Sequence, residues 1–235
     1  MPQLPGVVRS ADPAVLGFDT NTPLTRAIAE DMKSRGFHYC IRYVARTAKP
    51  NSIDLSRTEA EIILAAGLAL MVVQHPRAEG WQLAPIRYSF VSHGVVKTGT
   101  EQSMGGSDGA HAAYHALLLG FPPAVNVWCD LEGIAGGAAE EDVIQYCNDW
   151  HDAVAAAGYV PGVYVGAQAI LDDTQLFRDL KFDHYWKSLS NVPDIESRGY
   201  QMIQSNQHME GAIEIDNNLT RTDNLGGRVQ WLAPQ

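Results

Sequence analysis

Long apolar runs and clusters of basic residues are both missing from this chain of 235 residues. No apolar segment reaches the length that a membrane span needs, and no Lys/Arg-rich run is present. The formal net charge of −10 disfavours binding to nucleic acid or to an anionic membrane. Residues 1–10 contain no apolar stretch of the signal-peptide type. We therefore expect a protein made in the cytoplasm, with any export by a non-classical route such as phage lysis or a secretion system.

Cysteine is also scarce, and the chain has no Gly-rich phosphate loop after any strand-like run. The three cysteines, Cys40, Cys129 and Cys147, lack the spacing of a metal site. Cys40 and Cys129 lie in apolar strand-like runs, which predicts reduced thiols in the core. Internal repeats and low-complexity tracts are absent from the sequence. We expect no cofactor.

Short apolar runs alternate with helical patterns after an irregular N-terminal arm, residues 1–14. Predicted strands cover residues 15–19, 38–44, 68–74, 124–130, 162–165, 184–189, 200–205 and 212–216. Predicted helices cover residues 24–35 (with Thr22 as N-cap), 56–66, 109–119, 138–157 and 167–180.

Eight nearly continuous apolar strands favour a closed α/β barrel of the TIM type, formed by residues 15–235 as one domain. Residues 191–199 and 206–211 are too short for crossover helices, so we expect five βα units followed by three strands with short loops. An open doubly wound sheet is the alternative, but the chain lacks the Gly-rich phosphate loop that is typical of that fold. Residues 75–106, with Trp81, Tyr88, Phe90 and His93, are predicted to hold a hairpin over the barrel mouth, and residues 217–235 a final partial helix.

The apolar run 126–132 ends in two acids, Asp130 and Glu132. Because side chains alternate between the faces of a strand, these two carboxylates are expected to point the same way. Two like charges on one face repel each other and are costly to bury. Cleavage of a glycosidic bond needs such a pair, one acid to protonate the leaving oxygen and the other to act at the sugar carbon. A solvated strand end with two surface charges is the alternative.

Two more acids, Asp19 and Asp216, fall at the ends of the first and eighth predicted strands. The carboxyl ends of barrel strands gather on one rim, where active sites lie, so we predict a pocket of four acids. Aromatic rings and amides near other strand ends are candidates for contact with a sugar. These candidate residues are Tyr164, Trp186, Gln204, Gln74 and Arg42. Taken singly, Tyr164 and Trp186 also fit core positions, and Arg42 also fits a residue that only neutralises the acids.

Four short segments, in this order, resemble the family 25 glycoside hydrolases (lysozymes or muramidases) and, more closely, the glycoside-hydrolase-like family known as domain of unknown function 1906. They are Gly17-Phe18-Asp19-Thr20-Asn21, Trp128-Cys129-Asp130-Leu131-Glu132, Gly162-Val163-Tyr164 and Ile215-Asp216-Asn217. The resemblance spans residues 17–232 and implies a barrel of five βα units and three further strands. It implies Glu132 as general acid, Asp130 as the assisting acid, and Asp19 and Asp216 as flanking acids. Asn21 is a further candidate for substrate contact.

Three functions are compatible with these residues. The first is hydrolysis of a β-linked amino-sugar polymer, with peptidoglycan as the substrate that the resemblance favours. The second is a barrel that binds a glycan or a partner without turnover. We expect a monomer whichever function applies. The third is a hydrolase that uses the same carboxylates to hold magnesium or calcium. A transition metal is not expected, because the sequence has no His-rich ligand set.

Overall fold

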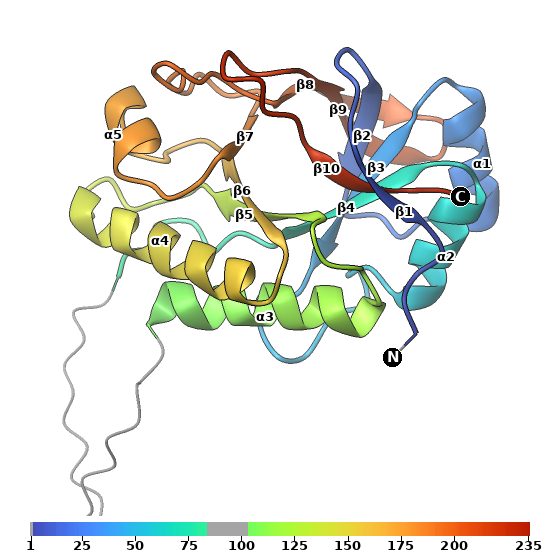
Figure 1. Cartoon of the computed structure of the whole chain (residues 1–235), viewed down its shortest axis with the longest axis horizontal. Helices are drawn as coiled ribbons and strands as arrows, with labels where there is room; N and C mark the ends of the chain where they lie inside the picture. Colours follow the sequence, from blue (N-terminus) through green and yellow to red (C-terminus); the bar gives the residue numbers. More distant parts are fainter. Residues whose placement is uncertain (1, 84–102) are drawn as a thin grey trace, which may run out of the picture.

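The computed structural model describes residues 2–83 and 103–235, which form an α/β barrel with helices along its outside (Figure 1). Going round the barrel, the strands follow the order β4-β3-β2-β9-β8-β7-β6-β5, and β5 pairs with β4 to close it. These strands are β2 (Leu16–Thr20), β3 (Tyr39–Val44), β4 (Ala69–Gln74), β5 (Asn126–Leu131), β6 (Val160–Val165), β7 (His184–Lys187), β8 (Met202–Glu210) and β9 (Ile213–Thr220). The helices are α1 (Arg26–Ser34), α2 (Arg57–Ala65), α3 (Met104–Leu119), α4 (Glu140–Ala156) and α5 (Asp173–Arg178). The predicted five βα units followed by three strands are confirmed.

The last barrel strand runs in the opposite direction to its neighbours. β9 pairs antiparallel with both β2 and β8, whereas the pairs from β2 round to β8 through β3, β4, β5, β6 and β7 are parallel. A short turn at Gly211 joins β8 to β9, and a turn of that length makes a hairpin rather than a crossover. The amino-terminal half of β9, rather than its carboxyl end, therefore reaches the rim where β2 ends.

The two chain ends close a seam between β4 and β5. β10 (Gln230–Ala233) pairs antiparallel with β1 (Val7–Ser10) along its length and meets β4 at Leu70. The pairing of β4 with β5 is short, starting at Val72. The prediction of a partial helix in residues 217–235 is wrong, because this segment supplies β10. The arm 1–14 is not wholly irregular, since it contains β1.

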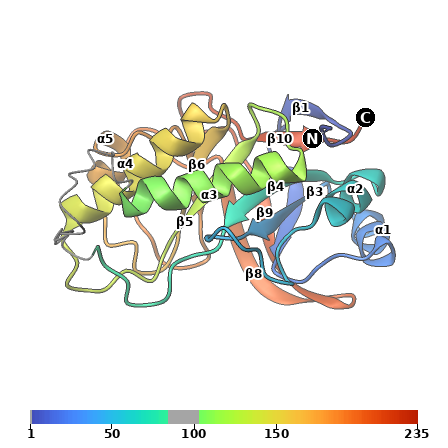
Figure 2. The ribbon, with the colours of Figure 1, turned by 90° about the horizontal axis from the view of Figure 1, so that it is seen from below.

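Helix α3 begins earlier than the sequence pattern predicts. Ser103 caps it, and it passes through Gly105 and Gly109, residues that usually weaken helices. A side chain at Gly105 would lie 2.0 Å from the carbonyl oxygen of Tyr146, and one at Gly109 would lie 2.5 Å from that of Trp150. The glycines thus allow α3 to lie directly on α4, and Figure 2 shows the two helices side by side.

Two other helices differ from their predicted bounds. Thr25, not Thr22, caps α1, with its hydroxyl accepting from the amide of Ile28. α5 is far shorter than the predicted helix 167–180. Gln168 and Ile170 adopt positive φ angles of 58° and 57°, which an α-helix cannot contain.

Large aromatic residues fill the barrel below the rim. The rings of Trp128 and Trp186 meet edge to face at 5.8 Å, and Trp186 contacts Tyr164 in the same manner at 4.5 Å. Cys40, Cys129 and Cys147 are free thiols and buried, which agrees with the core positions predicted for the first two. No helix among the described residues is long and apolar enough to cross a membrane.

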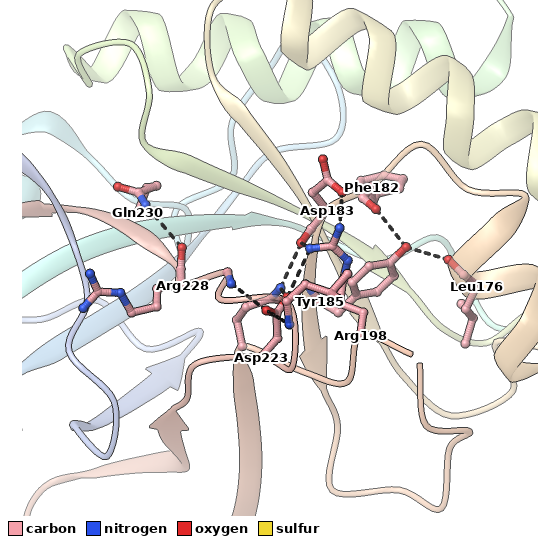
Figure 3. Close-up of polar contacts among 11 residues, drawn as sticks. Leu176, Phe182, Asp183, Tyr185, Arg198, Asp223, Arg228 and Gln230 are labelled. Carbon is pink, nitrogen blue, oxygen red and sulfur yellow. Dashed lines mark hydrogen bonds and ion pairs between the residues drawn. The ribbon is translucent and has the colours of Figure 1, made fainter. Parts of the chain in front are cut away.

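A polar network anchors the segment that replaces a crossover helix between β7 and β8 (Figure 3). Arg198 lies between two carboxylates, at 2.6 Å from Asp183 and 3.1 Å from Asp223. The hydroxyl of Tyr185 donates to the carbonyl oxygens of Leu176 and Phe182. These contacts fix β7, which carries Trp186 towards the barrel centre.

Candidate active site

The four predicted acids meet at one rim of the barrel. Asp19 lies near the end of β2 and is in register with Asp216 of β9. Asp130 is the penultimate residue of β5, and Glu132 follows directly after that strand. The sequence analysis placed Asp216 at the carboxyl end of a strand; the structure corrects this, because antiparallel β9 brings its amino-terminal half to the rim.

Asp19 is held inside the pocket by neutral donors. Its side chain is 2% exposed, and its Oδ2 accepts hydrogen bonds from Asn218 Nδ2 at 2.7 Å and Gln204 Nε2 at 3.1 Å. The Tyr43 hydroxyl also contacts it. Burial, with a smaller contribution from the charge of Asp216, raises the pKa of Asp19 to about 7. The Asp19 carboxyl is therefore partly protonated near neutral pH.

Gln204 links three walls of the pocket. Its amide nitrogen donates to Asp19 and, at 3.3 Å, to Asp216 Oδ2. Its amide oxygen accepts from the Tyr164 hydroxyl at 2.8 Å and from the backbone amide of Leu189. A single amide thereby fixes the spacing of β2, β6, β8 and β9 at the rim.

Burial together with the charge of Glu214 raises the pKa of Asp216 as well.

Asp130 and Glu132 form the second pair of acids. Asp130 is 8% exposed, and its Oδ1 is buried without a hydrogen-bond partner in the described residues. Burial and the neighbouring charges of Glu132 and Asp19 raise the pKa of Asp130 well above its ordinary range. Glu132 is more accessible, and partial burial raises its pKa. Such a pair titrates as a unit, and it holds a proton above the pH at which an isolated carboxyl would lose it.

Two backbone segments grip the loop that carries Glu132. The indole Nε1 of Trp81 donates to the carbonyl oxygen of Glu132 at 2.8 Å, and the amide of Gly80 donates to that of Gly133 at 2.7 Å. From the other side, the carbonyl oxygen of Ala167 accepts from the amide of Gly133. The departure of residues 167–170 from helical geometry thus serves to position Glu132.

Tyr43 belongs to a stacked group behind Asp19. Its ring stacks on that of His75, with centroids 4.8 Å apart and planes inclined by 22°. His75 Nε2 lies 2.6 Å from Asp54 Oδ1, and Asp54 Oδ2 accepts the backbone amide of Asn51. The loops after β3 and β4 therefore fix the ring whose hydroxyl touches Asp19.

A cavity of about 150 Å³ opens beside this cluster. Its wall combines the ends of β2 and β3 with the β8–β9 hairpin, and its lining is mostly polar. The lining residues are Asp19, Thr20, Asn21, Tyr43, Gln207, Glu214, Ile215 and Asp216. The arrangement offers one carboxyl group, that of Asp19, whose pKa of about 7 lets it hold or release a proton near neutral pH. Next to it lie amides and hydroxyls that can bind a polar, uncharged ligand.

Three predicted substrate contacts, Arg42, Gln74 and Trp186, lie outside this pocket, and the first two face away from it. Arg42 is fully buried, and its guanidinium binds Glu59 at 2.7 Å and the backbone carbonyl oxygens of Thr20 and Ile53. Gln74 is also buried, donating to the carbonyl oxygen of Asp108 and accepting from Trp150. Both face the helices, because side chains alternate along a strand and Tyr43 takes the inward position next to Arg42.

Trp186 is 1% exposed and donates through Nε1 to Asn218 Oδ1 at 2.8 Å, so it supports the pocket from below. Tyr164, Gln204 and Asn21 do lie at the pocket. The sequence analysis missed Asn218 as a site residue; its position two residues after Asp216 would place it on the same face. It also missed Gln207 and Glu214, which only the hairpin geometry brings to the cavity. The predicted hairpin residues Tyr88, Phe90 and His93 lie outside the described residues.

No group of three or more His, Cys, Asp or Glu side chains suited to a metal ion occurs in residues 2–83 and 103–235. Side-chain amides of Gln204 and Asn218 already donate to Asp19, and Gln204 also donates to Asp216. The geometry of the described site therefore gives the magnesium or calcium alternative no support.

Comparison with protein families matches residues 30–220 to the model of the Rv2525c-like, glycoside hydrolase-like domain. The chain belongs to this Rv2525c-like family. The match covers β3 to β9 and includes three of the four acids, Asp130, Glu132 and Asp216. No curated protein sequence matches the chain significantly.

Solved structures of a glycosyl hydrolase, a muramidase and an autolysin share the barrel of this Rv2525c-like domain. A family 25 glycosyl hydrolase from Bacillus anthracis has a TM-score of 0.53 and 11% identity, over 90% of this chain and 91% of its own. A muramidase from Trichobolus zukalii has a TM-score of 0.58 and 14% identity, over 86% of this chain and 92% of its own. A third similar structure is the modular autolysin LytC from Streptococcus pneumoniae in complex with a synthetic peptidoglycan ligand. Its TM-score is 0.55 and its identity 12%, over 88% of this chain and 46% of its own. At these identities the similarity shows the fold, which is the predicted lysozyme-like barrel.

Proposed function

We propose that this domain is a glycoside hydrolase that cleaves a β-linked amino-sugar polymer, with peptidoglycan as the substrate and Glu132 as the general acid. One observation carries the proposal. Carboxyl groups from three strands converge on one rim, and burial raises the pKa of every one of them. A general acid must hold its proton at the working pH, and a raised carboxyl pKa provides that.

The roles divide by accessibility. Glu132 is the more exposed member of its pair, which supports its role as the donor to the glycosidic oxygen. Asp130 lies deeper, and in this proposal it acts at the sugar carbon. Asp19 and Asp216 complete the pocket wall and bind hydroxyl groups of the sugar. Membership of a glycoside hydrolase-like family and the peptidoglycan ligand of the structurally similar autolysin support this substrate class.

Purified bacterial cell walls provide the test. Wild-type protein should lower the turbidity of a wall suspension and generate new reducing ends, and a chelator should not change either rate. Glu132→Gln keeps the size and hydrogen-bonding capacity of the side chain but cannot donate a carboxyl proton, so we expect loss of at least about a hundredfold in rate. Glu141→Gln, on the exposed first turn of α4, should retain full activity.

Two outcomes would contradict the proposal. Wild-type protein that binds glycan but releases no reducing ends would be a binding module. Activity that a chelator removes would instead indicate a metal-dependent hydrolase.

A further inference from the structure

The β8–β9 hairpin continues past the barrel rim directly beside the acid pocket. β8 has nine residues and β9 eight, whereas neighbouring β7 has four. Figure 2 shows the β8 end of this hairpin projecting from the barrel. A register shift between Gln204 and Gln207 marks a bulge where β8 leaves the barrel wall. Bulges redirect side chains and are frequent beside active sites.

One face of the hairpin is packed against the body of the protein. Ile213 and Ile215 are 3% and 1% exposed and share that face, since they are two positions apart on β9. Arg35, the C-cap of α1, fixes the tip by donating to Glu210 Oε1 at 2.6 Å, and it is itself held by Asp31 Oδ2 at 2.8 Å. The hairpin is therefore held in place, and its opposite face is exposed within the part of the chain that the structure describes.

The open face continues the wall of the cavity. Gln207 is paired with Asp216, and Met209 with Glu214, so these four side chains share one face. Gln207, Glu214 and Asp216 line the cavity. Met209 follows in the same row, farther from the barrel, and is 64% exposed. An apolar side chain next to amide and carboxyl groups is suited to a sugar ring, which has apolar C–H faces and hydroxyl edges.

We propose that this open face is a saccharide-binding subsite for a sugar adjoining the one bound among the four acids. The Gln207 amide and the Glu214 carboxylate bind hydroxyl groups, and the Met209 side chain lies against the face of the ring. The two carboxylates on this face favour a neutral sugar, such as GlcNAc, over one that carries a free carboxylate. The inference rests on the proposed function for the kind of polymer that is bound.

Binding in a Glu132→Gln background tests the subsite without turnover. The probes are a GlcNAc–MurNAc disaccharide and the corresponding tetrasaccharide, both prepared from peptidoglycan and measured by isothermal titration calorimetry. We expect the tetrasaccharide to bind about tenfold more tightly than the disaccharide. Met209→Ala, at a residue outside the cavity lining, should remove most of that difference and leave disaccharide affinity unchanged, and Gln207→Ala should also lower tetrasaccharide affinity. Both side chains are exposed, so the fold is not at risk.

Leu117→Ala is the matched control, because Leu117 is 62% exposed on α3 and lies outside the cavity lining. It should bind both probes like the parent protein. Unchanged tetrasaccharide affinity in Met209→Ala and Gln207→Ala would overturn the subsite, whatever the wild-type protein does to cell walls. Conversely, wild-type protein that leaves walls intact but shows the expected affinity pattern would retain the subsite and contradict hydrolysis alone.

Discussion

The buried carboxyl of Asp19, with a pKa of about 7, links the stability of the fold to pH. Its ordinary pKa is 3.8, so between pH 4 and 7 the native protein holds a proton that the unfolded chain has released. Stability from this group is complete below pH 4 and is lost as the pH rises through 7. Asp130, Glu132 and Asp216 act in the same direction, because their pKa values are also raised.

Asp19→Asn should weaken this pH dependence. The asparagine oxygen can still accept from Asn218 and Gln204, and the substituted side chain carries no charge to desolvate. Urea unfolding at pH 5 and pH 8 should show that wild-type protein loses about 2 kcal/mol more stability than the variant over this interval. Equal losses in the two proteins would mean that Asp19 titrates at an ordinary pKa.

Burial also sets the cost of losing Arg42, whose guanidinium faces Glu59 inside the protein. Arg42→Ala leaves the Glu59 carboxylate buried without its cation, and we expect a loss of about 3–5 kcal/mol in the free energy of unfolding. Arg178→Ala, which breaks the exposed pair with Glu196, should cause a much smaller loss. Similar losses for the two variants, measured by urea unfolding, would contradict the structural role assigned to Arg42.

Residue types near strand ends could be predicted from the sequence, but their direction could not. The sequence analysis named Arg42 and Gln74 as candidates for substrate contact because both lie near the ends of strands. Of two residues adjacent on a strand, one side chain faces the barrel interior and the other faces the helices. Pairing between strands, such as that of Tyr43 with Val73, decides which one faces inward, and this pairing exists only in the folded sheet. Both faces of a buried parallel strand are apolar, so its sequence has no polar–apolar alternation that would show which side chains point inward.

At the scale of elements, Gly166 at the end of β6 leaves space for the Glu132 side chain. A Cβ atom there would lie 2.5 Å from Glu132 Cβ and 2.7 Å from Glu132 Oε2, closer than such atoms approach. Gly166→Ala should therefore displace Glu132 and lower kcat on cell walls by about ten- to a hundredfold.

Gly136→Ala is the control for Gly166→Ala, because a Cβ at Gly136 meets nothing within 4 Å. It should leave kcat unchanged. Wild-type activity in Gly166→Ala would show that the precise position of the Glu132 side chain does not govern the reaction.

The helices show which local signals fail. α2 begins directly after Ser56, the first residue of the predicted helix 56–66, and the Ser56 hydroxyl caps it by accepting from the Glu59 amide. α3 starts before its glycines because close packing on α4 outweighs their low helix propensity. The predicted helix 167–180 loses its first turns because the carbonyl oxygens of Ala167 and Gln168 bind the loop after Glu132. Local propensity therefore fails here where a tertiary contact determines the backbone.

At the scale of the whole molecule, barrel closure gathers acids that lie far apart in the sequence. The alternation of strands and helices was enough to predict the barrel, and the adjacency of its first and last strands is confirmed by the pairing of β2 with β9. The reversed direction of β9 could not be read, because it depends on a hairpin turn in a segment with no Asn-Gly type signal. Asp216 reaches the rim because antiparallel β9 brings its amino-terminal half there.

The central claim is that this rim cleaves a glycan backbone with Glu132 as the acid. Mass spectrometry of the soluble products from purified peptidoglycan tests it most directly, with wild-type protein, Glu132→Gln and Glu141→Gln compared at equal concentration. We predict that wild-type protein and Glu141→Gln release fragments with new reducing-end sugars and that Glu132→Gln releases none. Equal release by Glu132→Gln, or fragments formed only by cleavage of the peptide crosslinks, would contradict the claim.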